Sequence, residues 1–278
     1  IEDGILFDSA KRFLIHYTAS KPEDKYTIPS SVEWIGKHSF YKCQNLKEVV
    51  ISENVKFMGN NAFSDCDKIH LINKSPYFNY EEGVLYNRDN TQCMHYSMGS
   101  GVKTIHLKNT VRTIGRNCFW NCSMIEKIII PESVRQIGYN PFAPCTNITF
   151  DVRCQNYAEK EGILYESTFK EMICCPASAV KNGTIKIPDS VVNIGRNAFT
   201  GCTSLHEITI PENVAFISRS SFSNCSNLKK VTIPYSIKEM ADWCFNNCIN
   251  LEEIRLPKNL VIPPNTFNNC PKVRVERY

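Results

Sequence analysis

Cysteine is the residue type most able to carry chemistry here, since it occurs 14 times in 278 residues. Cysteines can form disulfides, bind zinc as thiolates or fill small apolar positions in a core. The pairs Cys118-x-x-x-Cys122 and Cys244-x-x-x-Cys248 resemble paired zinc ligands. The spacing of the whole set decides between these possibilities.

Eight of the cysteines mark a repeat of 23 residues, shortened to 22 in the last copy. Its consensus is I-P-x-x-V-x-x-I-G-x-x-A-F-x-x-C-x-x-L-x-x-I-x, with a Phe three residues before every repeat cysteine. The repeat cysteines are Cys43, Cys66, Cys122, Cys145, Cys202, Cys225, Cys248 and Cys270. In each apparent zinc pair the second cysteine is the repeat cysteine and the first occupies the small Ala position, so core packing is favoured over zinc. We therefore expect mostly free thiols. One disulfide that involves Cys154, or one of Cys93, Cys174 and Cys175, remains an alternative.

A longer period interrupts the repeats. Gly4, Gly83 and Gly162 each begin a short apolar segment, 79 residues apart, and a second strand-like segment follows about ten residues later. These segments predict β-hairpin islands over residues 1–25, 72–102 and 152–183, between repeats at 26–71, 103–151 and 184–278. His16, His95 and Cys174 are equivalent island positions, but two coils separate successive islands, so one metal ion should not bridge them.

Each repeat is too short to bury its own apolar side, so neighbouring coils must stack into a solenoid. The segment L-x-x-I-x-I predicts a short half-buried strand, and the following Pro ends it because Pro has no N–H for the ladder. The I-G pair predicts a turn in which Gly adopts positive φ. The A-F-x-x-C segment predicts one helical turn, with Phe and Cys forming internal ladders.

This repeat resembles the BspA-like leucine-rich repeats over residues 26–71, 103–151 and 184–278, and the islands look like inserts common in that family. Ser52 and Lys108 in the Pro position, and Cys118 and Pro141 in the Ala position, depart from the pattern. The resemblance implies one leucine-rich-repeat solenoid domain over 1–278, β-rich α/β, with β-hairpin islands. It also implies a secreted or cell-surface protein that attaches to host matrix proteins or other cells.

Composition narrows the function further. The net charge is +4 without a Lys/Arg run, so no nucleic-acid partner is expected. The longest aliphatic run, Ile128-Ile129-Ile130, is far too short to span a membrane. No catalytic, phosphate-binding or dinucleotide motif occurs, so we expect no enzyme activity, no cofactor and no metal.

The ends suggest a fragment. The chain starts within an island, and its last segment resembles the two segments that lead into islands. We therefore expect a piece of a longer chain. Separately, we expect this chain to be a monomer.

A solenoid offers an extended strand-lined face. The outward strand positions form the candidate protein-binding face: Glu48, Val50, His106, Lys127, Ile129, Lys186, Glu207, Thr209, Lys230, Thr232, Glu253 and Arg255. We expect a non-enzymatic protein-binding or adhesion module. The alternatives are a structural spacer without its own ligand and, less favoured, a carbohydrate-active or hydrolytic protein using an island cleft.

Overall fold

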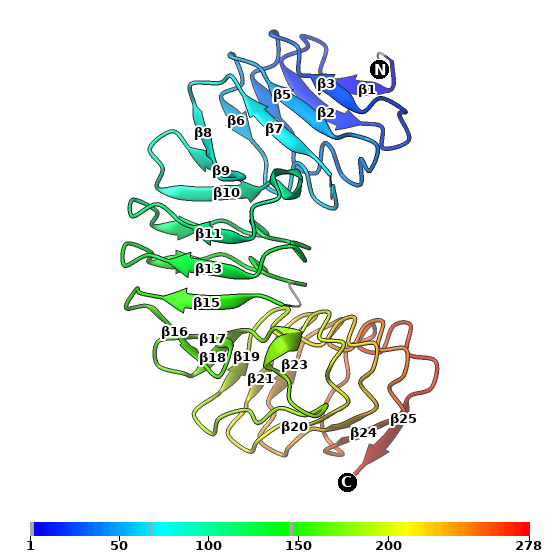
Figure 1. Cartoon of the computed structure of the whole chain (residues 1–278). Helices are drawn as coiled ribbons and strands as arrows, with labels where there is room; N and C mark the ends of the chain where they lie inside the picture. Colours follow the sequence, from blue (N-terminus) through cyan, green and yellow to red (C-terminus); the bar gives the residue numbers. More distant parts are fainter. Residues whose placement is uncertain (1–2, 67, 145–146) are drawn as a thin grey trace. The chain divides into compact units, whose positions relative to one another are not determined.

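The computed structural model describes residues 3–66, 68–144 and 147–278 (Figure 1). It divides into two compact units. The first unit contains residues 1–125 with 133–142, and the second contains residues 126–132 with 143–278. Cys145 lies outside the described residues.

The first unit contains two kinds of strand, because a coil can contribute both a longer strand and a two-residue strand. The longer strands are β3 (Lys25–Thr27), β5 (Glu48–Ile51), β7 (His70–Asn73) and β11 (Thr104–His106). The two-residue strands are β4 (Trp34–Ile35), β6 (Phe57–Met58), β12 (Thr113–Ile114) and β14 (Gln136–Ile137). Pairing between successive coils is parallel, as in β3–β5–β7 and β4–β6.

The second unit repeats this arrangement. Its longer strands are β13 (Lys127–Ile130), β15 (Thr149–Val152), β20 (Glu207–Thr209), β22 (Lys230–Thr232), β24 (Glu253–Leu256) and β25 (Arg274–Arg277). Its two-residue strands are β19 (Asn193–Ile194), β21 (Phe216–Ile217) and β23 (Glu239–Met240). Glu207 lies opposite Lys230, and Lys230 opposite Glu253, so the 23-residue period is the strand register.

The islands are antiparallel, as predicted. The first pairs β1 (Ile5–Phe7) with β2 (Phe13–Tyr17). The other two have three strands: β8 (Phe78–Glu81), β9 (Val84–Asn87) and β10 (Gln92–Tyr96), then β16 (Tyr157–Lys160), β17 (Ile163–Glu166) and β18 (Glu171–Cys174). The last strand of each island pairs in parallel with the first two-residue strand after it: β2 with β4, β10 with β12, and β18 with β19. The islands are therefore built into the solenoid rather than attached to its surface.

The predicted phenylalanine ladders form the core within each unit. Phe199 and Phe222 stack with ring centroids 4.7 Å apart, and Phe222 and Phe245 follow at 5.1 Å. In the first unit Phe40 stacks on Phe63 at 4.9 Å. Burial of these large aromatic side chains between successive coils contributes to the apolar stabilisation, together with the buried Ile, Val and Leu side chains of each coil.

The repeat cysteines bond across coils as well as filling space. The thiols of Cys225 and Cys248 donate to the carbonyls of Phe199 and Phe222 in the preceding coil, both at 3.1 Å, and Cys270 donates to that of Phe245 at 2.9 Å. These carbonyls belong to turns, outside the strand ladders. A small side chain with a weak donor suits this position.

The predicted helical turn is wrong. The helices of the described residues are the two 3₁₀ turns η1 (Met98–Ser100) and η2 (Ala177–Ala179), each of which follows the last strand of an island. In the A-F-x-x-C segments two left-handed residues, two positions before and two after the Phe, interrupt any helix, as at Asn61 (φ 61°) and Asp65 (φ 56°). Asn fills these positions in several coils, and it tolerates this conformation better than most residues.

The predicted role of the repeat glycine is also wrong. Gly36, Gly59, Gly115, Gly138 and Gly195 are not among the residues with positive φ. Instead they allow neighbouring coils to approach closely: a Cβ at Gly59 would lie 2.8 Å from the carbonyl carbon of Gly36 in the preceding coil.

Candidate binding surfaces

The predicted binding face lies largely on the longer strands. Eleven of its twelve residues are in β5, β11, β13, β20, β22 and β24, at exposed or half-exposed positions. Lys186 is exposed but belongs to an irregular segment, outside any strand. The structure therefore brings these residues together in sets, within each unit, along adjacent parallel strands.

In the second unit the charges of this face pair across the strands. The Nζ of Lys230 lies 3.4 Å from Oε1 of Glu253, and the Nε of Arg255 lies 3.1 Å from Oε2 of Glu276. Thr209 of β20 and Thr232 of β22 lie opposite each other, two positions after Glu207 and Lys230 on the same strands. Parallel strands place residues of equivalent repeats side by side, so alternating charge along the repeats produces cross-strand ion pairs.

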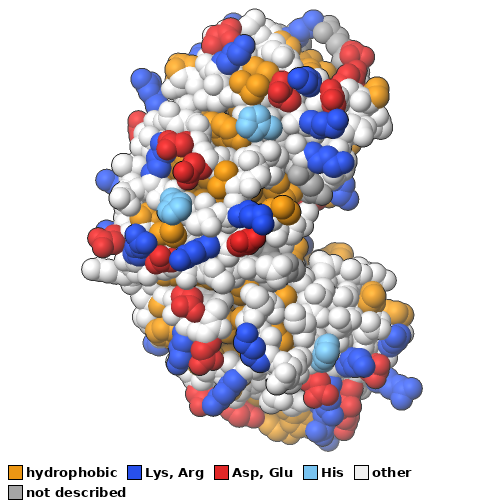
Figure 2. Space-filling view, in the orientation of Figure 1, with side chains coloured by type: hydrophobic (Ala, Val, Ile, Leu, Met, Phe, Trp, Pro, Cys, Tyr) orange, Lys and Arg blue, Asp and Glu red, His pale blue; other side chains and the backbone are white. Residues whose placement is uncertain are grey.

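The same pairing occurs on other strands. In the first unit Lys25 lies 3.7 Å from Glu48. In the second unit Asp151 of β15 accepts hydrogen bonds from Arg153 and lies 3.9 Å from Lys127, and these cations hold the pKa of the Asp151 carboxyl below its usual range. Figure 2 shows basic and acidic side chains interspersed on the surface of each unit. The face is thus a charge-balanced sheet surface rather than a basic patch.

The sequence interpretation missed a second exposed row, in the first unit. Phe13 of β2 lies opposite Trp34 of β4, and Trp34 lies opposite Phe57 of β6. The Trp34 and Phe57 side chains are each 48% exposed, with ring centroids 4.1 Å apart. We call Phe13, Trp34 and Phe57 the aromatic row. Its sequence signal was an aromatic residue two positions before the repeat glycine in two successive coils, Trp34 before Gly36 and Phe57 before Gly59.

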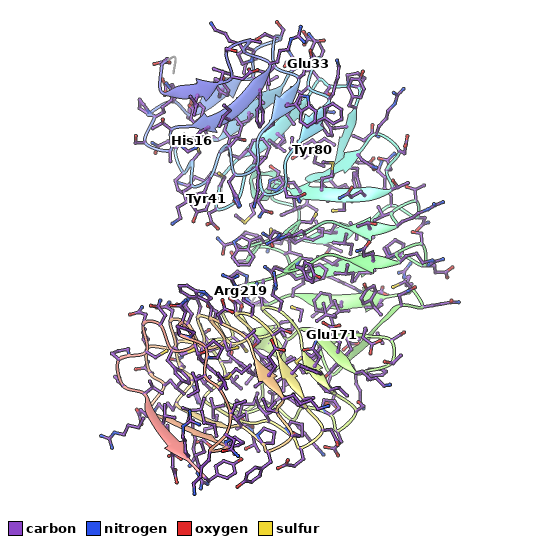
Figure 3. All side chains as sticks on the ribbon, turned by 180° about the vertical axis from the view of Figure 1, so that it is seen from behind. His16, Glu33, Tyr41, Tyr80, Glu171 and Arg219 are labelled. Carbon is purple, nitrogen blue, oxygen red and sulfur yellow. The ribbon has the colours of Figure 1, made fainter. Side chains whose placement is uncertain are left out.

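Polar residues occupy most of the corresponding positions elsewhere. These polar residues are Gln92, Thr113 and Gln136 in the first unit, and Glu171, Asn193 and Glu239 in the second. The exception is Phe216 of the second unit. Figure 3 labels Glu33, which precedes Trp34, and Glu171 of the third island. Since the fold accepts polar residues at this position, folding alone does not require the three consecutive aromatics.

A pocket of about 520 Å³ lies beside the aromatic row, between β6 and the second island. Its lining includes the aromatic row itself, Tyr77 and Met94, and the charged residues Lys37, Lys56, Arg88 and Asp89. A further pocket of about 720 Å³ lies in the second unit beside β23, where Tyr235, Val261 and Tyr278 contribute. In each unit a pocket thus lies next to the edge strand of a ladder of two-residue strands.

The cysteine pairs that resembled zinc ligands lie in the core. Cys118 and Cys244 occupy the Ala position and are at most 1% exposed, like Ala198. The 13 cysteines outside position 145 are buried thiols. Across residues 3–66, 68–144 and 147–278, no group of three or more His, Cys, Asp or Glu side chains has the arrangement of a metal site.

The equivalent island residues His16 and His95 have different surroundings. His16 is exposed in β2, whereas the His95 ring packs 5.5 Å from Phe63, and burial lowers the pKa of His95 to about 4. A neutral ring in this position serves packing, next to the phenylalanine ladder.

Comparisons with known proteins identify the class of this solenoid. A family model described as the BspA-type leucine-rich repeat region matches residues 19–149, 90–172 and 177–276, in six copies. The chain therefore belongs to the BspA-type leucine-rich repeat family. Comparison with curated protein sequences gives no match.

Solved structures share the fold at low sequence identity. A leucine-rich repeat protein from Eubacterium ventriosum is 19% identical with a TM-score of 0.56, over 96% of this chain and 78% of its own. A leucine-rich cell surface protein from Faecalibacterium prausnitzii is 21% identical with a TM-score of 0.55, over 98% of this chain and 92% of its own. Within the described residues, helices as long and apolar as a membrane span do not occur.

Proposed function

We propose that this chain is a non-enzymatic protein-binding module of a secreted or cell-surface protein. The parallel strand rows carry the proposal, because each coil adds one strand to a regular, outward-facing surface that can contact an extended area of a partner. The description of the Faecalibacterium structure as a cell surface protein supports the location. The partner is a host matrix protein or a protein on another cell, and the module acts as a monomer.

The cross-strand ion pairs define how this face can bind. Lys230 and Glu253 neutralise each other, so a partner must match an alternating pattern of charge rather than a single sign. Exposed pairs of this kind contribute little to stability, on the order of 0–1 kcal/mol. Changing them should therefore alter recognition without unfolding the chain.

The test is binding of the purified chain to immobilised extracellular-matrix proteins and to intact host cells. We compare the wild type with Lys127→Glu, Lys230→Glu and Arg255→Glu, singly and combined. The expected result is at least a tenfold loss of affinity in the triple variant. Arg219→Glu, an exposed charge in a turn segment, is the matched control and should bind like the wild type.

A charge swap separates recognition from stability. Lys230→Glu combined with Glu253→Lys keeps the ion pair but reverses the pattern, so it should stay folded and still lose binding. Equal binding by the wild type, the triple variant and the swap would exclude this face.

A spacer without its own ligand is the second candidate, and the internal pairing of charges on the strand face favours it. A spacer predicts that no matrix protein or cell binds the chain, while the chain still separates two fused fluorescent domains at a fixed distance.

A further inference from the structure

The aromatic row ends at an open strand edge. β6 is the last strand of the sheet β1–β2–β4–β6, and the second island that follows it belongs to a different sheet. Edge strands present unpaired backbone groups that can pair with another chain. Here the edge forms one wall of the 520 Å³ pocket.

The preceding coils show which backbone groups are available. The carbonyls of Glu33 and Ile35 accept hydrogen bonds from Phe57 N and Gly59 N at 3.1 and 2.8 Å. The carbonyls of Lys56 and Met58 hold the equivalent positions one coil later. In the described part of the chain, backbone N–H groups do not reach these two carbonyls. By the same register, the Lys56 and Met58 carbonyls face the place where the next strand of the ladder would lie.

The side chains beside this edge define the chemistry of an occupant. A residue opposite Phe57 would extend the aromatic row, just as Phe57 follows Trp34. The following residue, opposite Met58, would face Met58 and Met94 in the pocket. The occupant is thus an extended peptide with an aromatic residue followed by an apolar one.

Charge adds a further requirement. Lys37, Lys56 and Arg88 line the pocket against one carboxylate, Asp89. Lys56 already pairs with Glu33 at 2.9 Å, whereas the described residues provide no ion-pair partner for Lys37 or Arg88. An acidic peptide complements these two cations.

We propose that the cleft between β6 and the second island binds an acidic, extended segment of a partner protein, which adds to β6 as a parallel strand and stacks an aromatic side chain on Phe57. The segment donates backbone N–H groups to the Lys56 and Met58 carbonyls. This site lies on a different surface from the strand face, and it depends on the proposed function only for the choice of a protein ligand.

The experiment selects a displayed random heptapeptide library on the whole chain, with counter-selection on the Trp34→Asn/Phe57→Thr double variant. These substitutions copy Asn193 and Thr113 at equivalent positions, so they should fold. The expected result is enrichment of acidic peptides with an aromatic–apolar pair, which lose at least tenfold affinity for the double variant in fluorescence anisotropy. Phe216→Thr, an exposed aromatic at the same position of the second unit, should bind like the wild type.

Backbone pairing and charge are tested separately. N-methylation of the peptide at its aromatic residue removes the donor to the Lys56 carbonyl and should weaken binding at least tenfold. Lys37→Glu and Arg88→Glu should weaken binding and its dependence on salt.

Several results would overturn the proposal. These are no enrichment, equal binding to the double variant, or equal binding of the N-methylated peptide. Binding of neutral oligosaccharides to the wild type but not to the double variant, without peptide binding, would make the aromatic row a sugar platform instead. The Lys127, Lys230 and Arg255 variants should leave peptide binding unchanged, so failure of the strand-face proposal is distinguishable from failure of this one.

Discussion

At the scale of single residues, burial changes the chemistry of groups that looked reactive in the sequence. Burial raises the pKa of the Cys244 thiol to about 12, and its Sγ donates to the Ala241 carbonyl at 2.6 Å. The pKa of Cys118 is raised in the same way, with burial as the main cause. Since the thiolate is the nucleophile and the metal ligand, these cysteines are poorly reactive in the folded chain.

Thiol titration tests this assignment. In the folded protein at pH 8 we expect very slow reaction with a disulfide reagent, because the described cysteines are buried and the raised pKa values of Cys118 and Cys244 leave these two groups little thiolate. After denaturation without reductant, most of the 14 cysteines should react. A total below the eight repeat cysteines would instead indicate disulfides.

His95 predicts a dependence of stability on pH. Its folded-state pKa of about 4 lies below the ordinary value of 6.5 because burial disfavours the charged ring. Above pH 6.5 the neutral ring is accommodated in both states. Between pH 6.5 and 4 the unfolded chain binds the proton first, so stability falls as the pH is lowered, by on the order of 1–3 kcal/mol for a half-buried ring.

Urea unfolding at several pH values between 4 and 7 measures this effect. His95→Gln should flatten the slope in this range relative to the wild type. His16→Gln, at the exposed equivalent position, controls for loss of an imidazole. An unchanged slope in His95→Gln would show that His95 is not the group responsible.

At the scale of elements, the coil is shaped by two backbone constraints. Left-handed residues produce the turn around the Phe, and in the last coils their side chains also connect neighbours: Asn247 donates to the Asn224 amide oxygen at 2.7 Å. The repeat glycine permits close contact between successive two-residue strands. Later coils place Ser218 and Ala241 at this position, so a Cβ is tolerated where the spacing allows it.

Gly59→Ala should therefore destabilise the first unit by about 1–3 kcal/mol, since the added Cβ forces a backbone shift in the preceding coil. Denaturant unfolding followed by circular dichroism measures the change. Ala241→Gly removes a Cβ at the equivalent position and should cost no more than about 1 kcal/mol. If both variants change stability equally, chain flexibility rather than close approach explains the glycine.

At the scale of the whole molecule, stability is a sum over neighbouring coils. Phe222 is fully buried and stacks on Phe199 and Phe245, whereas Phe267 is only partly buried and stacks on Phe245 at 5.8 Å. An internal Phe such as Phe222 therefore contributes to two interfaces, one with the preceding coil and one with the following coil.

Phe222→Ala should cost about 3–5 kcal/mol, and Phe267→Ala clearly less. Amide hydrogen exchange should show faster exchange on both sides of Phe222 in the first variant, but only in residues near 257–278 in the second. Equal loss of protection throughout the second unit in both variants would contradict a nearest-neighbour solenoid.

The sequence by itself determined the repeat, its core positions and the islands. Phe and Cys recur every 23 residues because each coil must present the same apolar side to its neighbours, so the ladder from Phe199 to Phe267 could be derived from spacing alone. The buried positions of Cys118 and Cys244 followed from the same alignment. The recurrent Asn at positions such as Asn61 and Asn117 also encodes the left-handed turns, although the A-F-x-x-C pattern taken alone predicts a helical turn there.

Only the tertiary structure decided which surfaces are available. Whether Lys230 and Glu253 pair depends on the contact between coils, and so does the approach of Gly59 to Gly36. The open edge of β6 arises because the second island belongs to another sheet, and no pattern within one coil encodes that. A repeat determines how equivalent residues stack, whereas a binding cleft forms where the stacking stops.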